Sequence, residues 1–197
     1  MIVIGDVHGC FTTLLALLNK LPRNRELCFL GDLIDRGPDS YKVVEFVKGK
    51  GHKCVLGNHE DMALKAYDNP LSHHEDLWIA NGGRQTLKSY PELKISSKHL
   101  SWFAGLPYFI EYKNYVMSHS NFAHGIDKHD AKTLTIWNRD TDTVLNDGRI
   151  NVIGHTPSRK VVSKDGLIII DTACVFGNSL TAYDLDNQTF FSQEFIG

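Results

Sequence analysis

The sequence is short of the features that mark secreted, disulfide-bonded or membrane-spanning proteins. It has 4 cysteines in 197 residues, and none forms a C-x-x-C pair. Cys28 and Cys54 lie inside apolar runs, where a reduced thiol behaves as a small hydrophobic side chain. No apolar run approaches the ~20 residues of a membrane helix, and residues 1–5 lack the basic start of a signal peptide. We therefore expect a cytoplasmic protein that has no membrane partner.

The chain also lacks an excess of charge of either sign. Its formal net charge is -2, which gives no general attraction for a polyanion, so we expect no nucleic-acid partner. The 42% hydrophobic and 22% charged residues are typical of a globular protein. A chain of this length can bury roughly 70% of its unfolded surface, so its core needs no disulfide. We interpret residues 1–197 as a single domain.

The first third of the sequence alternates between short apolar runs and helical patterns. Residues 1–4, 27–30 and 54–56 are short apolar runs that are each followed by a glycine, which is typical of buried parallel strands. Between them, residues 11–21 and 40–48 place apolar side chains at helical spacing. The pattern predicts a β-α-β-α-β arrangement with right-handed crossovers.

The remainder divides into a helical part and a β-rich part. Residues 60–105 are more polar and mostly helical in pattern, so we expect them to form an insertion in the domain. After residue 108, apolar runs flank turn-type residues at 113–114, 164–166 and 186–188. Each of these patterns predicts a β-hairpin.

Polar residues of the types that bind metal ions follow the first three expected strands. Asp6, Asp32 and Asn58 are spaced by 26 residues, one β-α unit per step. Because sites in parallel sheets form at the carboxyl ends of the strands, these side chains should converge. His119 and His155 follow two later β-runs. Carboxylate, amide and imidazole groups without thiolates suit divalent first-row metal ions.

Taken together, five short motifs resemble one known family. They are Gly-Asp-x-His-Gly at 5–9, Gly-Asp-x-x-Asp-Arg-Gly at 31–37, Gly-Asn-His-Glu at 57–60, the histidine at 119 and Gly-His-Thr at 154–156. In this order they look like the phosphoprotein phosphatase family of the calcineurin-like metallophosphoesterases, over nearly the whole chain. The small size and Asn81-Gly82-Gly83 are most similar to the bacterial and phage serine/threonine protein phosphatases. The resemblance implies an α/β, four-layer fold in which a two-sheet β-sandwich is flanked by helices.

The resemblance also implies a site for two divalent metal ions, which are often manganese in bacterial members, with iron, zinc, nickel and cobalt as alternatives. Asp6 and His8 would bind the first ion, Asp32 would bridge the two, and Asn58, His119 and His155 would bind the second. His59 would be the general acid, oriented by Asp35, while Arg36 and Arg139 would hold the phosphate and Asn58 would lie beside the substrate. One motif departs from the family, which usually has His-Ala-Gly where this chain has His119-Ser120-Asn121.

Several of these residues have a second interpretation. Arg36 could form an ion pair with Asp35 or Asp39 instead of binding phosphate. Glu60 and Asp61 are expected to begin a helix, where acidic side chains complement the helix dipole. Asp171 could brace the site from behind, and Asn81-Gly82-Gly83 could be a helix break or backbone that lines the site. We expect His73, His74, His124 and His129 to be solvated loop residues.

The sequence favours a metal-dependent phosphomonoesterase whose substrate is a phosphoprotein or phosphopeptide. Phosphoserine and phosphothreonine are the expected targets, phosphotyrosine is a further one, and a metal-bridging hydroxide would attack phosphorus directly. No phosphoenzyme is expected, because no cysteine or serine stands where a nucleophile is needed. The alternative enzyme is a dinucleoside-tetraphosphate (Ap4A) hydrolase of the same superfamily. A non-catalytic scaffold should have lost His59, an arginine or several ligands, whereas this chain keeps them all.

Overall fold

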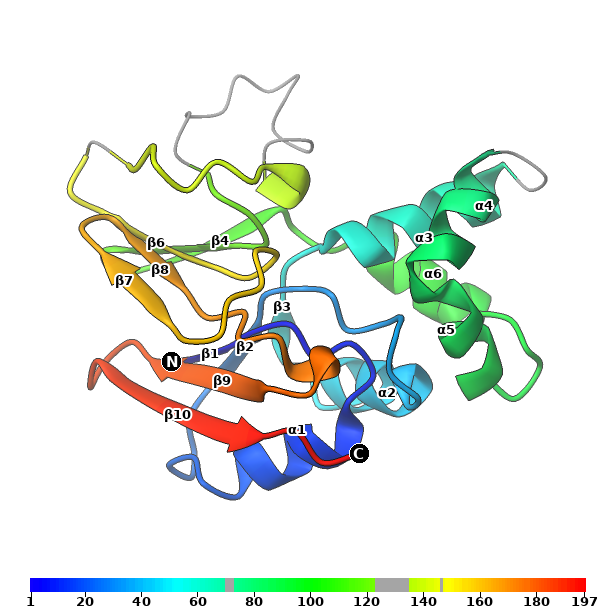
Figure 1. Ribbon diagram of the computed structural model, residues 1–197, viewed down its shortest axis with the longest axis horizontal. Coiled ribbons are helices and arrows are strands. Elements are labelled where there is room, and N and C mark those ends of the chain that lie inside the picture. Colours follow the sequence, from blue (N-terminus) through cyan, green and yellow to red (C-terminus); the bar gives the residue numbers. More distant parts are fainter. Residues whose placement is uncertain (70–72, 123–134, 146) are drawn as a thin grey trace.

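Two five-stranded sheets lie face to face in the computed structural model, which describes residues 1–69, 73–122, 135–145 and 147–197 (Figure 1). The first sheet has the order β10 (Thr189–Glu194), β9 (Ser179–Asp184), β1 (Ile2–Ile4), β2 (Leu27–Phe29) and β3 (Lys53–Cys54). The second has the order β4 (Phe109–Tyr112), β5 (Tyr115–Ser118), β6 (Ile150–Ile153), β8 (Leu167–Ile169) and β7 (Val162–Lys164). Both sheets are mixed, because β1, β2 and β3 are parallel, as are β5, β6 and β8. In the first sheet β9 runs antiparallel to β1 and β10 antiparallel to β9, and in the second sheet β4 and β7 run antiparallel to their neighbours β5 and β8.

The apolar strand sequences are explained by burial on both faces of the first sheet. In β1, Ile2 and Ile4 pack toward the helices, whereas Val3 packs toward the second sheet. Cys28 in β2 also faces the second sheet, and all four cysteines are buried and free. A strand covered on both faces needs no polar alternation, so the runs at 1–4 and 27–30 read as continuous hydrophobic segments.

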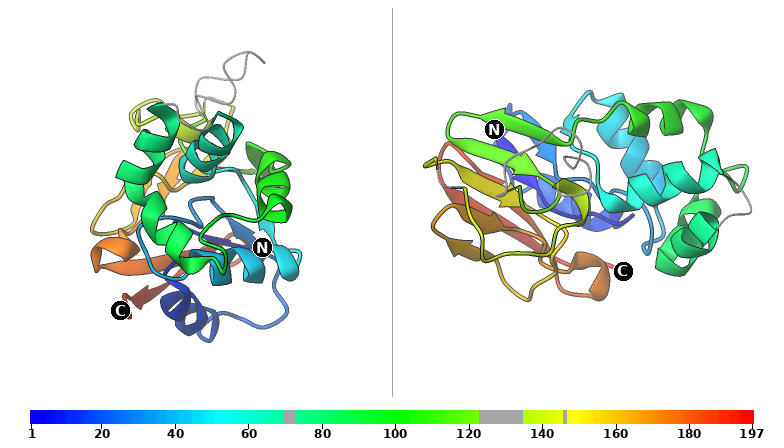
Figure 2. Two further views of the ribbon diagram at one scale, coloured as in Figure 1. Left: turned by 90° about the vertical axis from the view of Figure 1, so that its right-hand side faces the viewer. Right: turned by 90° about the horizontal axis from the view of Figure 1, so that it is seen from above.

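Helices cover the outer face and one end of the sandwich. The helices α1 (Phe11–Leu18) and α2 (Ser40–Gly49) lie against the first sheet, where they bury Leu14 and Val43. The helix α3 (Asn58–Asp68) leads away from the end of β3 to α4 (His73–Trp78), a π-helical turn η1 (Ile79–Gly83), α5 (Arg84–Ser89) and α6 (Ser97–Ala104). We call residues 73–104 the helical cap, which lies beside both sheets (Figure 2). Among the described residues, none of the helices has the length and apolar character that crossing a bilayer requires.

The secondary structure agrees closely with the sequence-based expectations. The β1-α1-β2-α2-β3 order is present, and all three predicted hairpins form, namely β4–β5, β7–β8 and β9–β10. The two-sheet sandwich flanked by helices is therefore confirmed. The helix predicted for residues 11–21 is shorter in the structure, where α1 ends at Leu18. The chain turns over residues 19–21, just before Pro22, which disfavours a helical conformation in the residue that precedes it.

Candidate functional site

The ends of five strands meet at one edge of the sandwich. Asp6 follows β1, Asp32 follows β2, and Asn58 begins α3 just after β3. From the second sheet, His119 follows β5 and His155 follows β6. This convergence is the one expected for the carboxyl ends of parallel strands.

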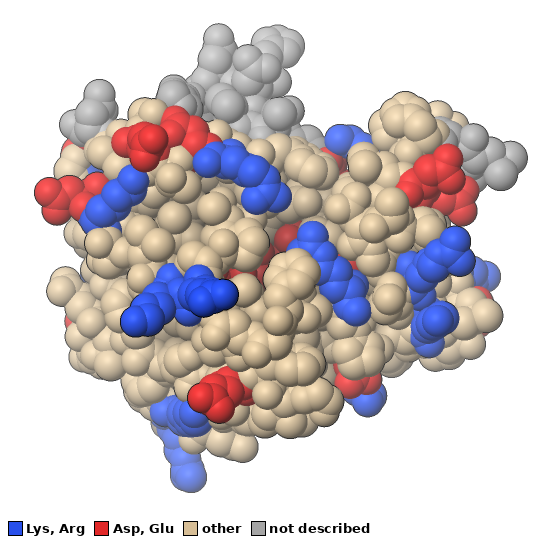
Figure 3. Space-filling model, viewed as in Figure 1, with Lys and Arg blue, Asp and Glu red and all other residues tan. Residues whose placement is uncertain are grey.

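A cavity of about 230 Å³ lies at this edge. Its walls include Asp6, Asp32, Asn58, His59 and His155, together with both candidate arginines, Arg36 and Arg139. Figure 3 shows acidic atoms at the bottom of a hollow and basic side chains around it. The cavity can therefore attract an anion at its rim and hold cations at its base.

Several site residues have a left-handed backbone that glycine adopts more readily. They are His8 (φ 44°), Asp32 (φ 47°), Asp35 (φ 72°), Arg36 (φ 68°) and His155 (φ 61°). Such conformations cost roughly 1–3 kcal/mol each, and they persist where surrounding contacts impose them. Their concentration in the loops after β2 and β6, and after β1, indicates that the fold holds these side chains in a fixed arrangement.

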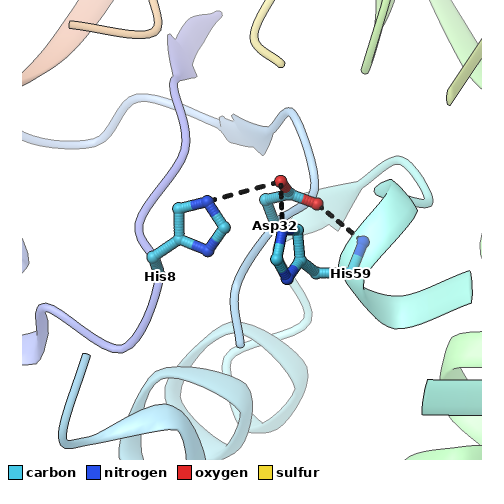
Figure 4. A group of neighbouring side chains, drawn as sticks. All are labelled: His8, Asp32 and His59. Carbon is cyan, nitrogen blue, oxygen red and sulfur yellow. Dashed lines mark hydrogen bonds and ion pairs between the residues drawn. The ribbon is translucent and has the colours of Figure 1, made fainter. Parts of the chain in front are cut away.

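Asp32 stands at the centre of the cluster. Its Oδ2 lies 3.4 Å from Nε2 of His8, and its Oδ1 lies 3.4 Å from Nε2 of His119. The backbone N–H of His59 donates to Oδ1 at 3.0 Å, and Figure 4 shows Asp32 between His8 and His59. Burial alone would raise the pKa of Asp32, but the neighbouring imidazoles lower it below its usual range. The carboxylate is thus charged, and its two oxygens face different groups of ligand-type side chains.

The lone-pair atoms around His119 and Asn58 are arranged as ligands of a cation would be. Nδ1 of His119 donates to the carbonyl of Leu30 at 2.7 Å, which leaves a lone pair on Nε2. That lone pair lies 2.8 Å from Oδ1 of Asn58, so two acceptors face each other. Oδ1 of Asn58 also lies 2.8 Å from Nδ1 of His155, while Nε2 of His155 and Oδ1 of Asp6 are buried without a hydrogen bond in the described part of the chain. These acceptor atoms cannot satisfy one another by hydrogen bonds, whereas a divalent cation would satisfy them all.

The imidazoles are in the protonation state that metal binding requires. Burial lowers the pKa of His8 and of His155 to about 3 and also lowers the pKa of His119. Near neutral pH all three rings are therefore uncharged. Ligand-type atoms of Asp6, Asp32 and His119 lie within 4.8 Å of one another, as do those of His8, Asp32 and His59. Asp32 belongs to both groups, whereas Asp6 lies with His119 and not with His8, the residue with which the resemblance pairs it.

His8 has a partner other than a metal in this structure. Its Nδ1 donates to the carbonyl of Ile34 at 2.8 Å, which fixes the ring. Its Nε2 accepts a hydrogen bond from the guanidinium of Arg36 at 2.7 Å. A metal ion on His8 would therefore require the Arg36 side chain to turn away from it.

His59 and Asp35 form a buried pair at the wall of the cavity. Nδ1 of His59 lies 2.7 Å from Oδ2 of Asp35, and the other ring nitrogen lies 3.9 Å from Oδ2 of Asp32. Burial opposes a charge on His59, but Asp32 and Asp35 outweigh it and raise the pKa of the ring. The arrangement presents Nε2 as a proton donor on the cavity side.

The two arginines lie at the cavity without the competing ion pairs considered from the sequence. Within the described residues, Asp35 pairs with His59, and Asp39 pairs with Lys42 at 2.7 Å. The guanidinium of Arg36 lies 5.3 Å from the ring centroid of Phe176. Arg139 donates to the carbonyl of His155 at 3.2 Å. Both arginines keep donors available for a ligand, because each uses only part of its guanidinium.

Two further buried carboxyl groups, those of Glu60 and Asp171, belong to the site, and their roles were only partly indicated by the sequence. Glu60 accepts hydrogen bonds from the backbone N–H groups of Asp32, Leu33 and Ile34 at 2.8–3.3 Å, so it holds the loop after β2. The sequence predicted only a helix start at Glu60, because its position after Gly57 carries no sign of the loop that it reaches. Asp171 also lines the cavity, and burial raises its pKa to about 6. The sequence suggested Asp171 as a brace behind the site, whereas the structure places it in the wall of the cavity.

The departure at residues 120–121 has a visible consequence. The Ser120 hydroxyl accepts from the backbone N–H of Asn138 at 3.0 Å. The Asn121 amide donates to the carbonyls of Asp140 at 2.8 Å and Thr143 at 2.7 Å. These bonds anchor the segment that carries Arg139, a role that alanine and glycine side chains could not fill.

Among the described residues, the candidates His73, His74 and Asn81-Gly82-Gly83 do not line the cavity. His73 is an exposed residue at the start of α4, beside His74. Gly82 breaks the helical conformation with φ 111° and packs against Arg36, so Asn81-Gly82-Gly83 is a helix break rather than a wall of the cavity. His124 and His129 lie outside the described residues. Phe176, by contrast, was missed by the sequence analysis although it lines the cavity and is 66% exposed.

Comparison with known proteins gives one consistent family. The profile of the family described as calcineurin-like phosphoesterase matches residues 1–185. The chain is 30% identical to the asymmetrical bis(5'-nucleosyl)-tetraphosphatase PrpE of Oceanobacillus iheyensis, over 96% of this chain and 90% of that protein. It is 31% identical to serine/threonine-protein phosphatase 1 of Salmonella typhimurium, over 91% of this chain and 88% of that protein. A crystal structure with the proposed assignment diadenosine tetraphosphatase has a TM-score of 0.76 at 23% identity and covers 100% of this chain and 93% of its own.

The names of the two relatives give different activities, a tetraphosphatase and a protein phosphatase. Their similarity to this chain, together with the match to the family profile, points to one family for all three. The chain belongs to the calcineurin-like phosphoesterase family, whose members are hydrolases that use divalent metal ions.

Proposed function

We propose that this chain is a metal-dependent phosphomonoesterase that removes phosphate from phosphoserine and phosphothreonine in proteins, with phosphotyrosine as a further substrate. The observation that carries the proposal is the His59–Asp35 pair at the wall of a cavity that also holds two arginines and the ligand-type cluster. A protein that only binds phosphate has no need of a proton donor held in this way.

The proposal assigns each residue a separate task. Asp6 and His8 would hold one divalent ion, Asn58, His119 and His155 would hold the other, and Asp32, which lies in both groups of ligand-type atoms, would serve both, with Mn²⁺ as the first candidate. The bound ions would supply an activated water and neutralise charge on the phosphoryl group. Arg36 and Arg139 bind the phosphoryl oxygens, for which a guanidinium offers paired donors that lysine lacks. His59 gives a proton from Nε2 to the leaving alkoxide while Asp35 holds its Nδ1.

The cavity size favours a substrate whose bulk remains outside. Its volume of about 230 Å³ is below the roughly 300–1,000 Å³ of pockets that enclose a drug-sized ligand. A phosphoryl group and the first atoms of a serine or threonine side chain fit such a space. A peptide backbone would then lie across the rim, near the exposed Phe176.

A dinucleoside-tetraphosphate hydrolase is the second candidate, and the relative named PrpE favours it. Its substrate would have to place its phosphates in the cavity and its nucleosides outside. Initial rates on a phosphoserine peptide and on diadenosine tetraphosphate, both with Mn²⁺, separate the two functions. A higher kcat/KM on the phosphopeptide supports the proposal, and a preference for the dinucleotide by more than about tenfold overturns the assigned substrate.

Two variants test the assigned tasks. Asn58→Ala should weaken Mn²⁺ binding, whereas His59→Asn should leave Mn²⁺ bound and lower kcat on a phosphoserine peptide by about 10²- to 10⁴-fold. Isothermal titration calorimetry with Mn²⁺ and steady-state kinetics give the two readouts. If both variants merely lose the metal, the division between ligand and acid is wrong.

Direct transfer to water is tested by single-turnover hydrolysis in heavy-oxygen water. The label should enter the released phosphate in the first turnover, and no phosphorylated protein should be trapped. A trapped phosphoenzyme, or turnover that persists in EDTA, would contradict the proposed mechanism.

A further inference from the structure

The Asp35 carboxylate, which pairs with His59, also accepts hydrogen bonds from two residues of the helical cap. Nε1 of Trp78 donates to Asp35 and lies 3.0 Å from both carboxylate oxygens. The hydroxyl of Thr86 donates to Oδ1 at 2.6 Å and accepts from the backbone N–H of Asp35 at 2.8 Å. Asp35 and Thr86 are completely buried, and Trp78 is 2% exposed. Water therefore does not replace these donors.

The two glycines of η1 allow the cap to reach this carboxylate. A Cβ on Gly83 would lie 2.7 Å from the indole ring of Trp78, so only glycine lets the indole fold back over the turn. Gly82 has φ 111°, and its carbonyl accepts from the backbone N–H of Arg36 at 3.3 Å. A Cβ on Gly82 would lie 2.6 Å from that nitrogen. The segment from Trp78 to Thr86 is thus fitted directly onto the loop that carries Asp35 and Arg36.

We propose that Trp78 and Thr86 are positioning residues for the general acid, since their hydrogen bonds fix the plane of the Asp35 carboxylate and thereby the ring of His59. The inference rests on the proposed role of His59 as the proton donor. A carboxylate bonded only to His59 could rotate about its Cβ–Cγ bond. Donors from α4 and α5 remove that freedom, so Oδ2 stays in line with Nδ1 of His59 and Nε2 stays directed at the leaving group.

The dependence of rate on the leaving group distinguishes positioning from packing. A phosphoserine peptide expels an alkoxide that needs a proton, whereas p-nitrophenyl phosphate expels a stable phenolate that does not. Trp78→Phe keeps an aromatic ring over Gly83 and removes the Nε1 donor. Thr86→Val keeps the shape of Thr86 and removes its hydroxyl. We expect each variant to lower kcat on the peptide by about tenfold or more, with kcat on p-nitrophenyl phosphate and KM within about twofold of wild type.

Matched variants make the comparison specific. Thr86→Ser restores the hydroxyl and should restore the rate on the peptide. Trp102→Phe makes the same chemical change on α6, where Trp102 packs against the hydrophobic core, and should leave both rates unchanged. If Trp78→Phe does not fold, the Thr86→Val and Thr86→Ser pair still decides the question.

Failure of this inference differs from failure of the proposed function. His59→Asn should reproduce the loss on the peptide and spare p-nitrophenyl phosphate; if it slows both equally, the acid role of His59 is overturned. If His59→Asn discriminates between the substrates but Trp78→Phe and Thr86→Val do not, the positioning role is overturned and both residues serve packing alone.

A readout independent of turnover examines the same geometry without metal. The Nδ1 proton of His59, bonded to a buried carboxylate, should give a strongly downfield proton resonance that disappears in His59→Asn. We expect this resonance to move upfield or broaden in Trp78→Phe and Thr86→Val and to persist in Thr86→Ser and Trp102→Phe. A resonance unchanged in all four variants would contradict the proposal.

Discussion

The strand ends and the helical cap contribute to the site in different ways. At the strand ends, Asp6, Asp32 and His155 turn their polar atoms toward a cavity where ligands can reach them. In the cap, Trp78 and Thr86 turn theirs toward another protein group, the Asp35 carboxylate. The first region therefore offers chemistry to ions and substrate, while the second sets the geometry of one catalytic group. Substitutions in the two regions should fail in different ways.

The largest effect is expected at the centre of the strand ends, from Asp32→Asn. Asp32 faces imidazoles on both of its oxygens, so loss of its charge should disturb both proposed ion sites. Changes behind a metal ligand typically cost about 10- to 100-fold, and a shared ligand should cost more than about 100-fold in kcat/KM. Calorimetry with Mn²⁺ and phosphatase assays measure the two losses.

The same chemical change at Asp39 provides the control for Asp32→Asn. Asp39 pairs with Lys42 at the surface of α2, so Asp39→Asn should leave Mn²⁺ stoichiometry and rate unchanged. An Asp32→Asn variant that still binds two ions with wild-type affinity would remove Asp32 from its central role.

A smaller loss of Mn²⁺ affinity and activity is expected from Gly154→Ala, because this substitution displaces only one of the candidate ligands, Asp6. A Cβ at Gly154 would lie 2.0 Å from Oδ1 of Asp6, so the carboxylate must move. We expect Mn²⁺ affinity and kcat/KM to fall by about 10- to 100-fold. Gly105→Ala, where the nearest atoms lie 3.6 Å away, is the matched control. Unchanged Mn²⁺ affinity in Gly154→Ala would exclude Asp6 as a ligand.

Much of the strand-end region could be predicted from sequence, because its signals are local. Asp6, Asp32 and Asn58 each follow an apolar run and recur at one β-α unit, so topology alone brings them together. The three hairpins were equally local, since each depends on a few turn residues between apolar runs.

The contacts of the cap could not be predicted, because they join residues that are distant in sequence. Trp78 lies 43 residues from Asp35, and Thr86 lies 51 residues from it. A tryptophan and a threonine in an amphipathic helix are ordinarily interpreted as core residues, and both are indeed buried. Glu60 lies in the first turn of α3, as its sequence position predicts, but its carboxylate also crosses to the loop after β2, which the sequence does not indicate. The sequence shows which side chains Trp78, Thr86 and Glu60 carry, but not the direction in which these side chains point, and their contacts depend on that direction.

An intermediate effect is expected where a strand end supports substrate binding, at Asn121→Ala. The lost amide frees the carbonyls of Asp140 and Thr143, so the segment with Arg139 should become less ordered. KM for a phosphopeptide should rise by about tenfold, the equivalent of about 1.4 kcal/mol, with kcat within about twofold. Asn187→Ala, which removes an amide bond to Asp184 in a turn, is the control. A fall in kcat at constant KM would contradict this role in substrate binding and would indicate that Asn121 supports the chemical step.

The smallest effect concerns a buried histidine of the cap, His99 on α6. Its Nδ1 lies 2.8 Å from the hydroxyl of Tyr90, and its Nε2 lies 2.6 Å from Oε1 of Glu45. Burial lowers the pKa of His99, Glu45 opposes the shift, and Lys98 and Lys48 add to it. The folded state therefore takes up this proton at a lower pH than the unfolded state does.

The direction of the resulting pH dependence follows from the lowered pKa of His99. Above about pH 6.5 the ring is neutral in both states and contributes no pH dependence. Below it the unfolded state binds the proton first, so the free energy of unfolding falls, by at most about 1.4 kcal/mol per pH unit. Urea unfolding at pH 7.0 and 5.5 should thus show a larger loss for wild type than for His99→Gln.

Mn²⁺ turns this measurement into a comparison of the two regions. His8, His119 and His155 at the strand ends also have lowered pKa values, and their protonation competes with ion binding. The pH dependence of the whole protein should therefore change between Mn²⁺ and EDTA. The difference between wild type and His99→Gln should not change, because the partners of the His99 ring among the described residues are Tyr90, Glu45 and Tyr41, none of which lines the cavity. If Mn²⁺ alters the difference between wild type and His99→Gln, ion binding at the strand ends affects His99 in the cap. The two regions would then be coupled by more than the contacts of Trp78 and Thr86 with Asp35.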